Sequence, residues 1–124
     1  MPNAKRVILC IDDDPDILEF LRIVIESNNY TVCQASSAEE GLQAYREAPP
    51  DLIICDLMME EVDAGTNLVK ELKALGNKAP VYMLSSTGDH LHSTIDASAL
   101  GLSGILQKPF DSESLLTLLR AKLG

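Results

Sequence analysis

The chain has no tryptophan and few aromatic residues of any kind, with three tyrosines and two phenylalanines among its 124 residues. It has no apolar run approaching the roughly 20 residues of a membrane-spanning helix, so membrane insertion is not expected. The N-terminus lacks the apolar core of a secretory signal peptide, and we therefore expect a cytoplasmic protein.

Basic residues are also few. Ten lysines and arginines stand against nineteen acidic residues, which gives a net charge of −9. Direct binding to nucleic acid is therefore not expected, because phosphate backbones are bound by basic surfaces.

Cysteine is scarce and falls in no recognisable pairing pattern. Cys10, Cys33 and Cys55 each lie inside an apolar run, and no C-x-x-C or Cys/His spacing occurs. This pattern favours neither a disulfide framework nor a thiolate metal site, and it predicts three reduced, buried side chains.

What the chain does have is a regular alternation of two hydrophobic periods. Short apolar runs typical of buried strands occupy residues 7–11, 52–56, 80–84 and 104–107, and residues 31–35 are expected to form a further strand. A segment with helical spacing follows each strand. The first runs from Pro15 to about residue 28 and the second from 38 to 48. The third bears Leu68, Val69, Leu72 and Leu75, the fourth covers 88–100, and the last is capped by Asp111 and bears Leu115, Leu116, Leu118, Leu119 and Leu123.

Five strand-helix units in succession predict an α/β fold with a five-stranded parallel sheet and helices on both faces. The flavodoxin-like strand order 2-1-3-4-5 fits a single domain over residues 1–124. Asp14 and Pro15 are expected to begin the first helix. The second has two overlapping capping boxes, Ser36 with Glu39 or Ser37 with Glu40, and the sequence leaves that choice open.

Several of the strands end in residues suited to phosphate chemistry. Asp12 and Asp13 follow the first strand, Asp56 ends the third, Ser85 follows the fourth and Lys108 follows the fifth. The carboxyl ends of parallel strands share one edge of a sheet, where ligands bind. Carboxylates, a hydroxyl and an ammonium in one crevice predict a Mg²⁺-dependent phosphate site.

Three motifs, in order along the whole chain, strengthen this interpretation: Ile11-Asp12-Asp13-Asp14, Pro50-Asp51-Leu52-Ile53-Ile54-Cys55-Asp56-Leu57-Met58-Met59 and Leu106-Gln107-Lys108-Pro109-Phe110. With these motifs the chain resembles the receiver domain of two-component response regulators, in particular the single-domain regulators of chemotaxis. The resemblance implies a cytoplasmic switch that is phosphorylated by a sensor histidine kinase or a histidine phosphotransfer protein. Such a protein catalyses only its own phosphorylation and dephosphorylation and signals to a downstream effector protein.

The resemblance also implies a role for each residue of the site. Asp56 matches the phosphoacceptor, which becomes an aspartyl phosphate. Mg²⁺ is expected on Asp12, Asp13, Asp56 and the backbone carbonyl of Met58. Lys108 and Ser85 match the residues that bind the phosphoryl group. Effector binding is expected on the surface formed by residues 88–100, the fifth strand and the last helix.

The chain departs from the family pattern in three places. Glu60-Glu61 replaces a common Pro-Gly in the loop beside the site. Ile105 stands where the family's switch usually has an aromatic residue, so Ser85 and Ile105 would form an incomplete switch whose output passes through residues 85–104. Met58 has no amide or acid to orient a hydrolytic water, and this favours a long-lived phosphoryl group.

Two other functions fit parts of the pattern. Asp12, Asp14 and Asp16 partly match the nucleophile motif of haloacid-dehalogenase-type Mg²⁺-dependent phosphohydrolases, although Asp16 stands where that motif has Thr or Val. A pseudo-receiver that signals only by binding is the other alternative, and the intact set of acids, hydroxyl and lysine disfavours it. The same aspartates do not form a calcium loop, because Ile17 replaces the required glycine.

Overall fold

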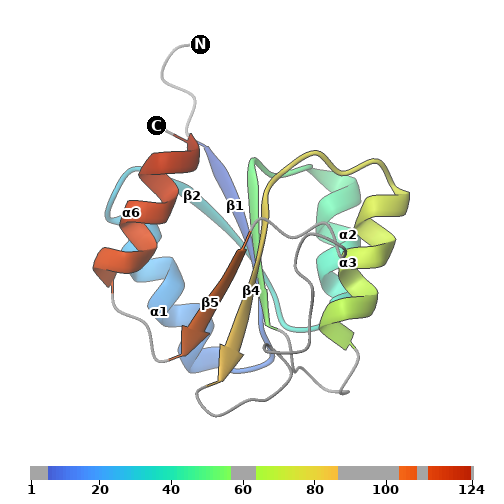
Figure 1. Cartoon of the computed structure of the whole chain (residues 1–124), viewed down its shortest axis with the longest axis horizontal. Coiled ribbons are helices and arrows are strands. Elements are labelled where there is room, and N and C mark those ends of the chain that lie inside the picture. The colour runs from blue at the N-terminus through green and yellow to red at the C-terminus, as the bar shows by residue number, and fades with distance from the viewer. Residues whose placement is uncertain (1–5, 57–63, 87–103, 109–111, 124) are drawn as a thin grey trace.

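The computed structural model describes residues 6–56, 64–86, 104–108 and 112–123, and for residues 56, 64–67, 69, 85, 86 and 104–108 it describes the backbone alone. Strands and helices alternate over most of this length, as Figure 1 shows. The strands are β1 (Val7–Ile11), β2 (Thr31–Ala35), β3 (Leu52–Asp56), β4 (Val81–Ser86) and β5 (Gly104–Lys108). The helices are α1 (Pro15–Glu26), α2 (Ala38–Glu47), α3 (Ala64–Ala74) and α6 (Ser112–Leu123).

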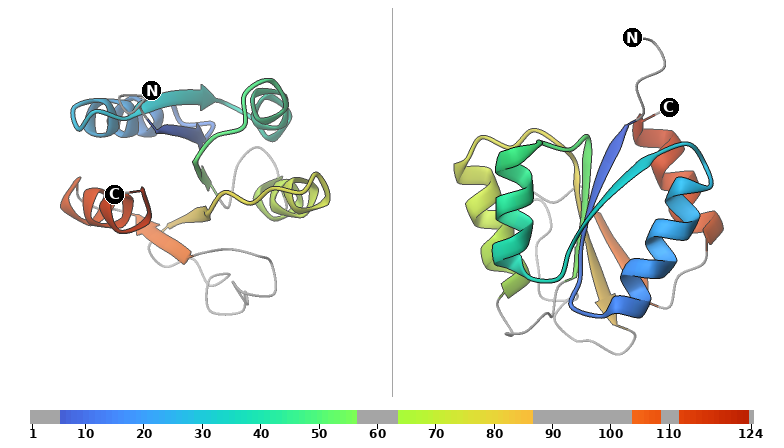
Figure 2. Two further views of the ribbon diagram at one scale, coloured as in Figure 1. Left: turned by 90° about the horizontal axis from the view of Figure 1, so that it is seen from above. Right: turned by 180° about the vertical axis from the view of Figure 1, so that it is seen from behind.

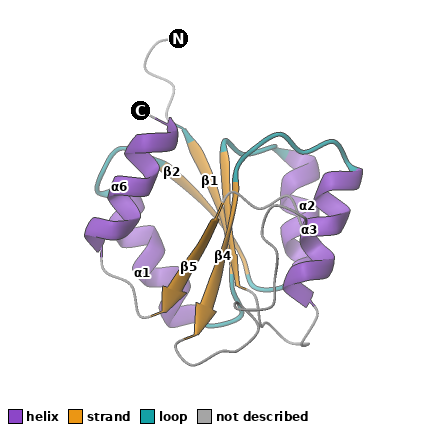
Figure 3. Cartoon of the chain, in the orientation of Figure 1, coloured by secondary structure: helices purple, strands orange, loops and turns teal. Residues whose placement is uncertain are grey.

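All strand pairs are parallel, and the sheet order is β2-β1-β3-β4-β5. The predicted parallel α/β sheet is thereby confirmed, with β1 between β2 and β3 and with β4 on the far side of β3. The carboxyl ends of the strands lie along one edge, at the bottom of Figure 3, and the helices run back from that edge. We call this the carboxyl edge, and the opposite one the amino edge.

The described helices cover both faces of the sheet. Figure 2 shows α1 and α6 on one side and α2 and α3 on the other. Because successive side chains of a strand point to opposite faces of the sheet, the strands contribute to two separate core clusters. One, under α2 and α3, contains Leu9, Ile11, Ile53, Cys55 and Met83, and the other, under α1 and α6, contains Ile8, Cys10, Ile54, Tyr82 and Leu84. None of the described helices is long and apolar enough to cross a bilayer.

Local hydrogen bonds explain where the first two helices begin. Asp14 is the N-cap of α1, its side chain accepts from the Asp16 backbone N–H, and Pro15 occupies the first turn as predicted. At α2 the structure selects the second capping box. The Ser37 hydroxyl accepts from the Glu40 N–H at 3.1 Å, and the Glu40 carboxylate reaches back to the Ser36 N–H at 2.9 Å.

One prediction about the core was wrong. Leu75 was expected on the buried stripe of the third helix, but its side chain is 45% exposed. The helix ends at Ala74 in a left-handed turn, with Gly76 at φ 84° and the Asn77 N–H donating to the Leu72 carbonyl. Leu75 therefore follows the end of the helix, where the predicted C-terminal residues Gly76 and Asn77 turn the chain away from the buried face.

The cysteine prediction was correct for two side chains and wrong for one. Cys10 and Cys55 are buried and none of the three cysteines forms a disulfide, but Cys33 is only half-buried. Cys33 lies on β2, the edge strand of the sheet, which is covered by fewer neighbours. The helix predicted over residues 88–100 lies outside the described residues.

Candidate functional site

The register of the strands brings the predicted acids to neighbouring positions on the carboxyl edge. Ile11 of β1 is paired with Cys55 of β3. Asp12 and Asp56 are the next residues on these two strands, which lie about 4.8 Å apart as in any sheet. Two residues that are 44 positions apart in sequence are thus brought to one place by the tertiary fold.

The same edge receives the polar ends of β4 and β5. Asp56 is paired with Leu84, so Ser85 is the following residue on the strand beside Asp56. Ser86 is paired with Lys108, which places the lysine backbone two strands from Asp56, roughly 10 Å away by ordinary strand spacing. The backbones of Asp56, Ser85 and Lys108 therefore lie where the sequence predicts them.

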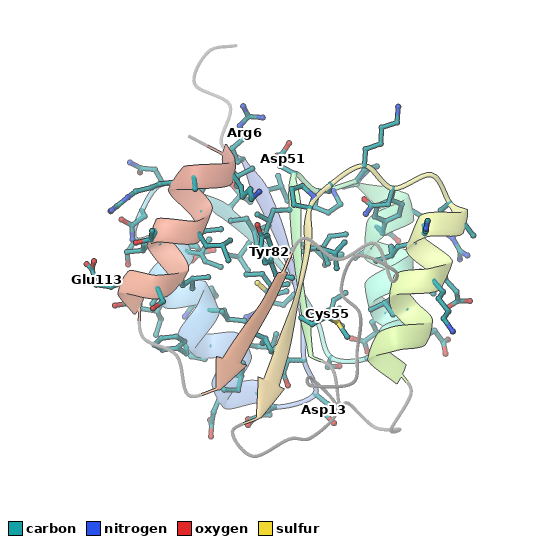
Figure 4. All side chains as sticks on the ribbon, viewed as in Figure 1. Arg6, Asp13, Asp51, Cys55, Tyr82 and Glu113 are labelled. Carbon is teal, nitrogen blue, oxygen red and sulfur yellow. The ribbon has the colours of Figure 1, made fainter. Side chains whose placement is uncertain are left out.

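Asp12 and Asp13 differ sharply in environment. Asp12 has no exposed surface, and its Oδ1 accepts from the Asp14 N–H at 2.9 Å while its own N–H donates to the Ala35 carbonyl at 3.1 Å. Asp13 is exposed and lies at the carboxyl edge, as Figure 4 shows. The end of β1 thus presents one fixed carboxylate and one accessible carboxylate.

This pair fits a hard divalent cation. Mg²⁺ takes oxygen ligands and keeps several waters, so it needs only one or two carboxylates and little else from the protein. A buried carboxylate such as Asp12 is also stabilised by a nearby positive charge, since burial penalises the ionised form. In the part of the chain whose side chains are described, no three His, Cys, Asp or Glu side chains gather into a metal site. Asp56 is described there by its backbone alone.

The thiols near the edge are poor nucleophiles. Burial raises the pKa of the Cys10 thiol far above its usual range, and the nearby Cys33 and Asp12 raise it further. The Cys55 thiol, one residue before Asp56, donates to the Met83 sulfur at 3.3 Å in the core under α2 and α3. These side chains therefore belong to the core, and the carboxylates are the groups at this edge that could bind a cation.

Three of the predicted site features cannot be placed in full. The Met58 carbonyl and the Glu60-Glu61 loop lie outside the described residues. Ile105 is paired with Met83 in the β4–β5 ladder. The switch proposed for Ser85 and Ile105 depends on side chains that are not described, and it stays a prediction.

Sequence reasoning missed Gly41, which lies in α2 directly over the end of β1. A Cβ atom built on Gly41 would lie 2.6 Å from the Cδ1 of Ile11, the residue before Asp12. A signal was present in the sequence, because an isolated glycine inside a helical pattern lowers helix stability and can have a packing reason.

Comparison with known proteins shows which family this sequence matches. Residues 8–120 match the family model described as "Response regulator receiver domain". The chain is 34% identical to the transcriptional regulatory protein FixJ of Azorhizobium caulinodans over 124 residues, which are 100% of this chain and 57% of that protein. It is 34% identical to the transcriptional regulatory protein GlrR of Escherichia coli over 115 residues, 93% of this chain and 26% of GlrR.

The fold is also similar to that of a solved chemotaxis protein, CheY4 of Vibrio cholerae. The TM-score is 0.86 at 30% sequence identity, and the match covers 97% of this chain and 100% of CheY4. Against the curated relatives, by contrast, the chain spans 57% of FixJ and 26% of GlrR. The matched region is thus only a part of those longer proteins.

Proposed function

Because the chain belongs to the response regulator receiver domain family, we propose that it is a phosphoacceptor switch of a two-component system, with Asp56 as the residue that is phosphorylated. The donor is a sensor histidine kinase or a histidine phosphotransfer protein. The observation that carries the proposal is the register of β1 and β3, which sets the buried Asp12 beside the strand position that holds Asp56.

The reaction needs little from the protein beyond positioning and charge. A carboxylate oxygen of Asp56 attacks the phosphorus of the phosphohistidine donor, the O–P bond forms as the N–P bond breaks, and the imidazole leaves. Lys108 supplies a positive charge for a phosphoryl oxygen, and Ser85 donates a hydrogen bond to the phosphoryl group once it is attached. Water later attacks the same phosphorus, which releases inorganic phosphate and restores the Asp56 carboxylate.

Asp12, Asp13, Asp56 and the Met58 carbonyl are the groups that would hold Mg²⁺. When bound, the ion neutralises charge between the anionic acceptor and the anionic donor. Asp12 and Asp13, at the end of β1, lie in different environments and would contribute differently to Mg²⁺ binding. Asp12 is held by a hydrogen bond from the Asp14 N–H, whereas the exposed Asp13 would be accessible to an ion that arrives from solvent.

The chain then acts as a signalling protein without turnover of a separate substrate. We propose that it works in the cytoplasm and passes its state to an effector protein through β5, α6 and residues 88–100. Ser85 and Ile105 would form the switch, and without an aromatic residue at position 105 the response would be a population shift of the backbone between residues 85 and 104. Direct contact with nucleic acid is not part of this proposal, given the net charge of −9.

The test is incubation with acetyl phosphate and Mg²⁺, followed by measurement of the intact mass. We expect a single phosphoryl adduct that is absent in Asp56→Asn and absent when the metal is chelated. Asp51→Asn is the matched control, because it makes the same chemical change at the other end of β3 and should leave labelling intact. Failure of the wild-type chain to gain the adduct, or an adduct that persists in Asp56→Asn, would contradict the proposal.

A further inference from the structure

Helix α2 approaches strand β1 more closely at Gly41 than any side chain would permit. A Cβ atom at this position would lie 2.6 Å from Cδ1, 3.0 Å from Cγ1 and 3.5 Å from Cγ2 of Ile11. Cβ atoms essentially never approach other heavy atoms closer than 3.0 Å. The helix therefore packs its backbone directly on the Ile11 side chain, and any residue with a Cβ atom would require that side chain or the helix to shift.

The contact lies where β1 meets the carboxyl edge. Ile11 is the last residue of β1, and it has no exposed surface. Asp12 follows it, held by its N–H to the Ala35 carbonyl and by its carboxylate to the Asp14 N–H. Displacement of the Ile11 backbone would be passed to Asp12 and Asp13, because only one and two planar peptide units separate them from Ile11.

On the α2 side of the contact, hydrogen bonds hold the first turn of the helix in place. The Gly41 N–H donates to the Ser37 carbonyl at 2.9 Å, one turn back in α2. The Ser37 and Glu40 capping bonds set the start of that turn, and Ser36 follows Ala35 at the end of β2. The first turn of α2 is thus tied to the same strand end whose carbonyl holds the Asp12 N–H.

We propose that Gly41 is a positioning residue for the carboxylates of Asp12 and Asp13, because it lets α2 clamp Ile11 and so fixes the end of β1. The inference rests on the proposed function of these carboxylates as Mg²⁺ ligands. A methyl group at position 41 would have to move Ile11 or the helix by at least 0.4 Å, the difference between 2.6 Å and 3.0 Å. Rotation about χ2 moves Cδ1 alone, and Cγ1 would still lie 3.0 Å from the methyl group, which is tighter than nearly all real Cβ contacts. Ile11 has no exposed surface, so its close-packed neighbours limit the room into which the side chain can move.

Three variants test the proposal: Gly41→Ala, Ile11→Val and the two combined. Alanine is the better helix former, so any loss in Gly41→Ala comes from the clash and not from helix propensity. Valine lacks the Cδ1 atom that lies 2.6 Å from the new methyl group, so the double variant exchanges one methyl group for another across the contact. Ile8→Val is the matched control, since it removes the same atom from a fully buried isoleucine at the other end of β1.

Two readouts are needed. The first is the amide chemical shifts of residues 12–14 in the metal-free protein, which we expect to move in Gly41→Ala, to return in the double variant and to stay unchanged in Ile8→Val. The second is titration with Mg²⁺ alone, followed by the Asp13 amide. We expect the half-saturating Mg²⁺ concentration to rise by about tenfold or more in Gly41→Ala, as it does when residues that support metal ligands are substituted. In the double variant it should return close to the wild-type value.

The proposal is overturned if Gly41→Ala changes the unfolding midpoint while the metal-free shifts and the Mg²⁺ titration stay as in the wild type. It is also overturned if the double variant does not recover. If Gly41→Ala fails to fold, the double variant compared with Ile11→Val decides the question by the same readouts. The metal-free shifts remain informative even if the wild-type chain takes no phosphoryl group, so a failure of the proposed function would be recognised separately.

Discussion

Replacement of Asp51 by alanine is expected to destabilise the fold by about 2 kcal/mol while leaving Mg²⁺ binding at the far edge unchanged. Asp51 lies before β3 on the amino edge, together with Arg6 and away from Asp13, as Figure 4 shows. Its Oδ2 accepts from the Val7 N–H at 2.8 Å, and its Oδ1 lies 3.7 Å from Nη1 of Arg6. The carboxylate thus joins the start of β1 to the start of β3.

The two interactions differ in strength. A hydrogen bond to a charged, partly buried group contributes about 1.5–3 kcal/mol, and its loss also leaves the Val7 N–H without its acceptor. The ion pair contributes about 0.5 kcal/mol or less, since the side chains of Arg6 and Asp51 are 57% and 38% exposed. We therefore expect Asp51→Ala to cost about 2 kcal/mol, Asp51→Asn about 1 kcal/mol because it keeps an oxygen acceptor, and Arg6→Ala no more than about 0.5 kcal/mol.

Urea unfolding followed by far-ultraviolet circular dichroism measures all three variants, and the method suits a chain without tryptophan. A Mg²⁺ titration on each variant then separates stability from the site. If Arg6→Ala is as destabilising as Asp51→Ala, the ion pair is the main contact and the reasoning is refuted. A weakened Mg²⁺ affinity in folded Asp51→Ala would refute the independence of the two edges.

Further predictions concern the second helix, the last helix and the metal. Ser37→Ala should cost about 1 kcal/mol through loss of the α2 N-cap, measured by urea unfolding. Hydrogen bonds from Ser36 lower the pKa of Glu40 below its ordinary 4.5. The stabilisation of the fold by the ionised Glu40 is therefore present above pH 4.5 and is lost as the pH falls through the lowered pKa. A Glu40→Gln variant should lose less stability than the wild type as the pH falls from 4.5 through this lowered pKa. Leu119→Ala, at a fully buried position, should cost about 2–5 kcal/mol. Asp13→Asn should unfold like the wild type in chelator yet lose most of the stabilisation that added Mg²⁺ gives the wild type, and equal stabilisation of both would contradict a metal role for Asp13.

Local sequence was sufficient for most of the elements. β1, β2 and β3 have the predicted bounds. For β1 and β3 the reason is that a short apolar run rich in β-branched residues, with turn residues on both sides, has few alternatives. The start of α1 was equally clear, because Asp14 and Pro15 act through bonds within one turn. The polar ends of the strands were visible as well, since the position of a residue after a strand is a property of the sequence alone.

Other features depended on neighbours that the local pattern does not reveal. The exposure of Leu75 follows from where the chain leaves α3, and the half-burial of Cys33 from the edge position of β2. The choice between the two capping boxes was decided by the geometry in which Glu40 reaches both the cap and Ser36. Each of these outcomes depends on where the chain turns and what then packs beside it, which a pattern of residue types leaves undetermined.

The sequence by itself determined which chemical groups the chain carries and on which strand each one ends. Only the tertiary structure decided that Asp12 is buried while Asp13 is exposed, and that Gly41 lies against Ile11. The physical reason is that periodicity acts within a few residues, whereas burial and close contact are set by elements far apart in the chain. In this protein the identity of the acids is a property of the local sequence, whereas their burial and their neighbours depend on β2, β3 and α2.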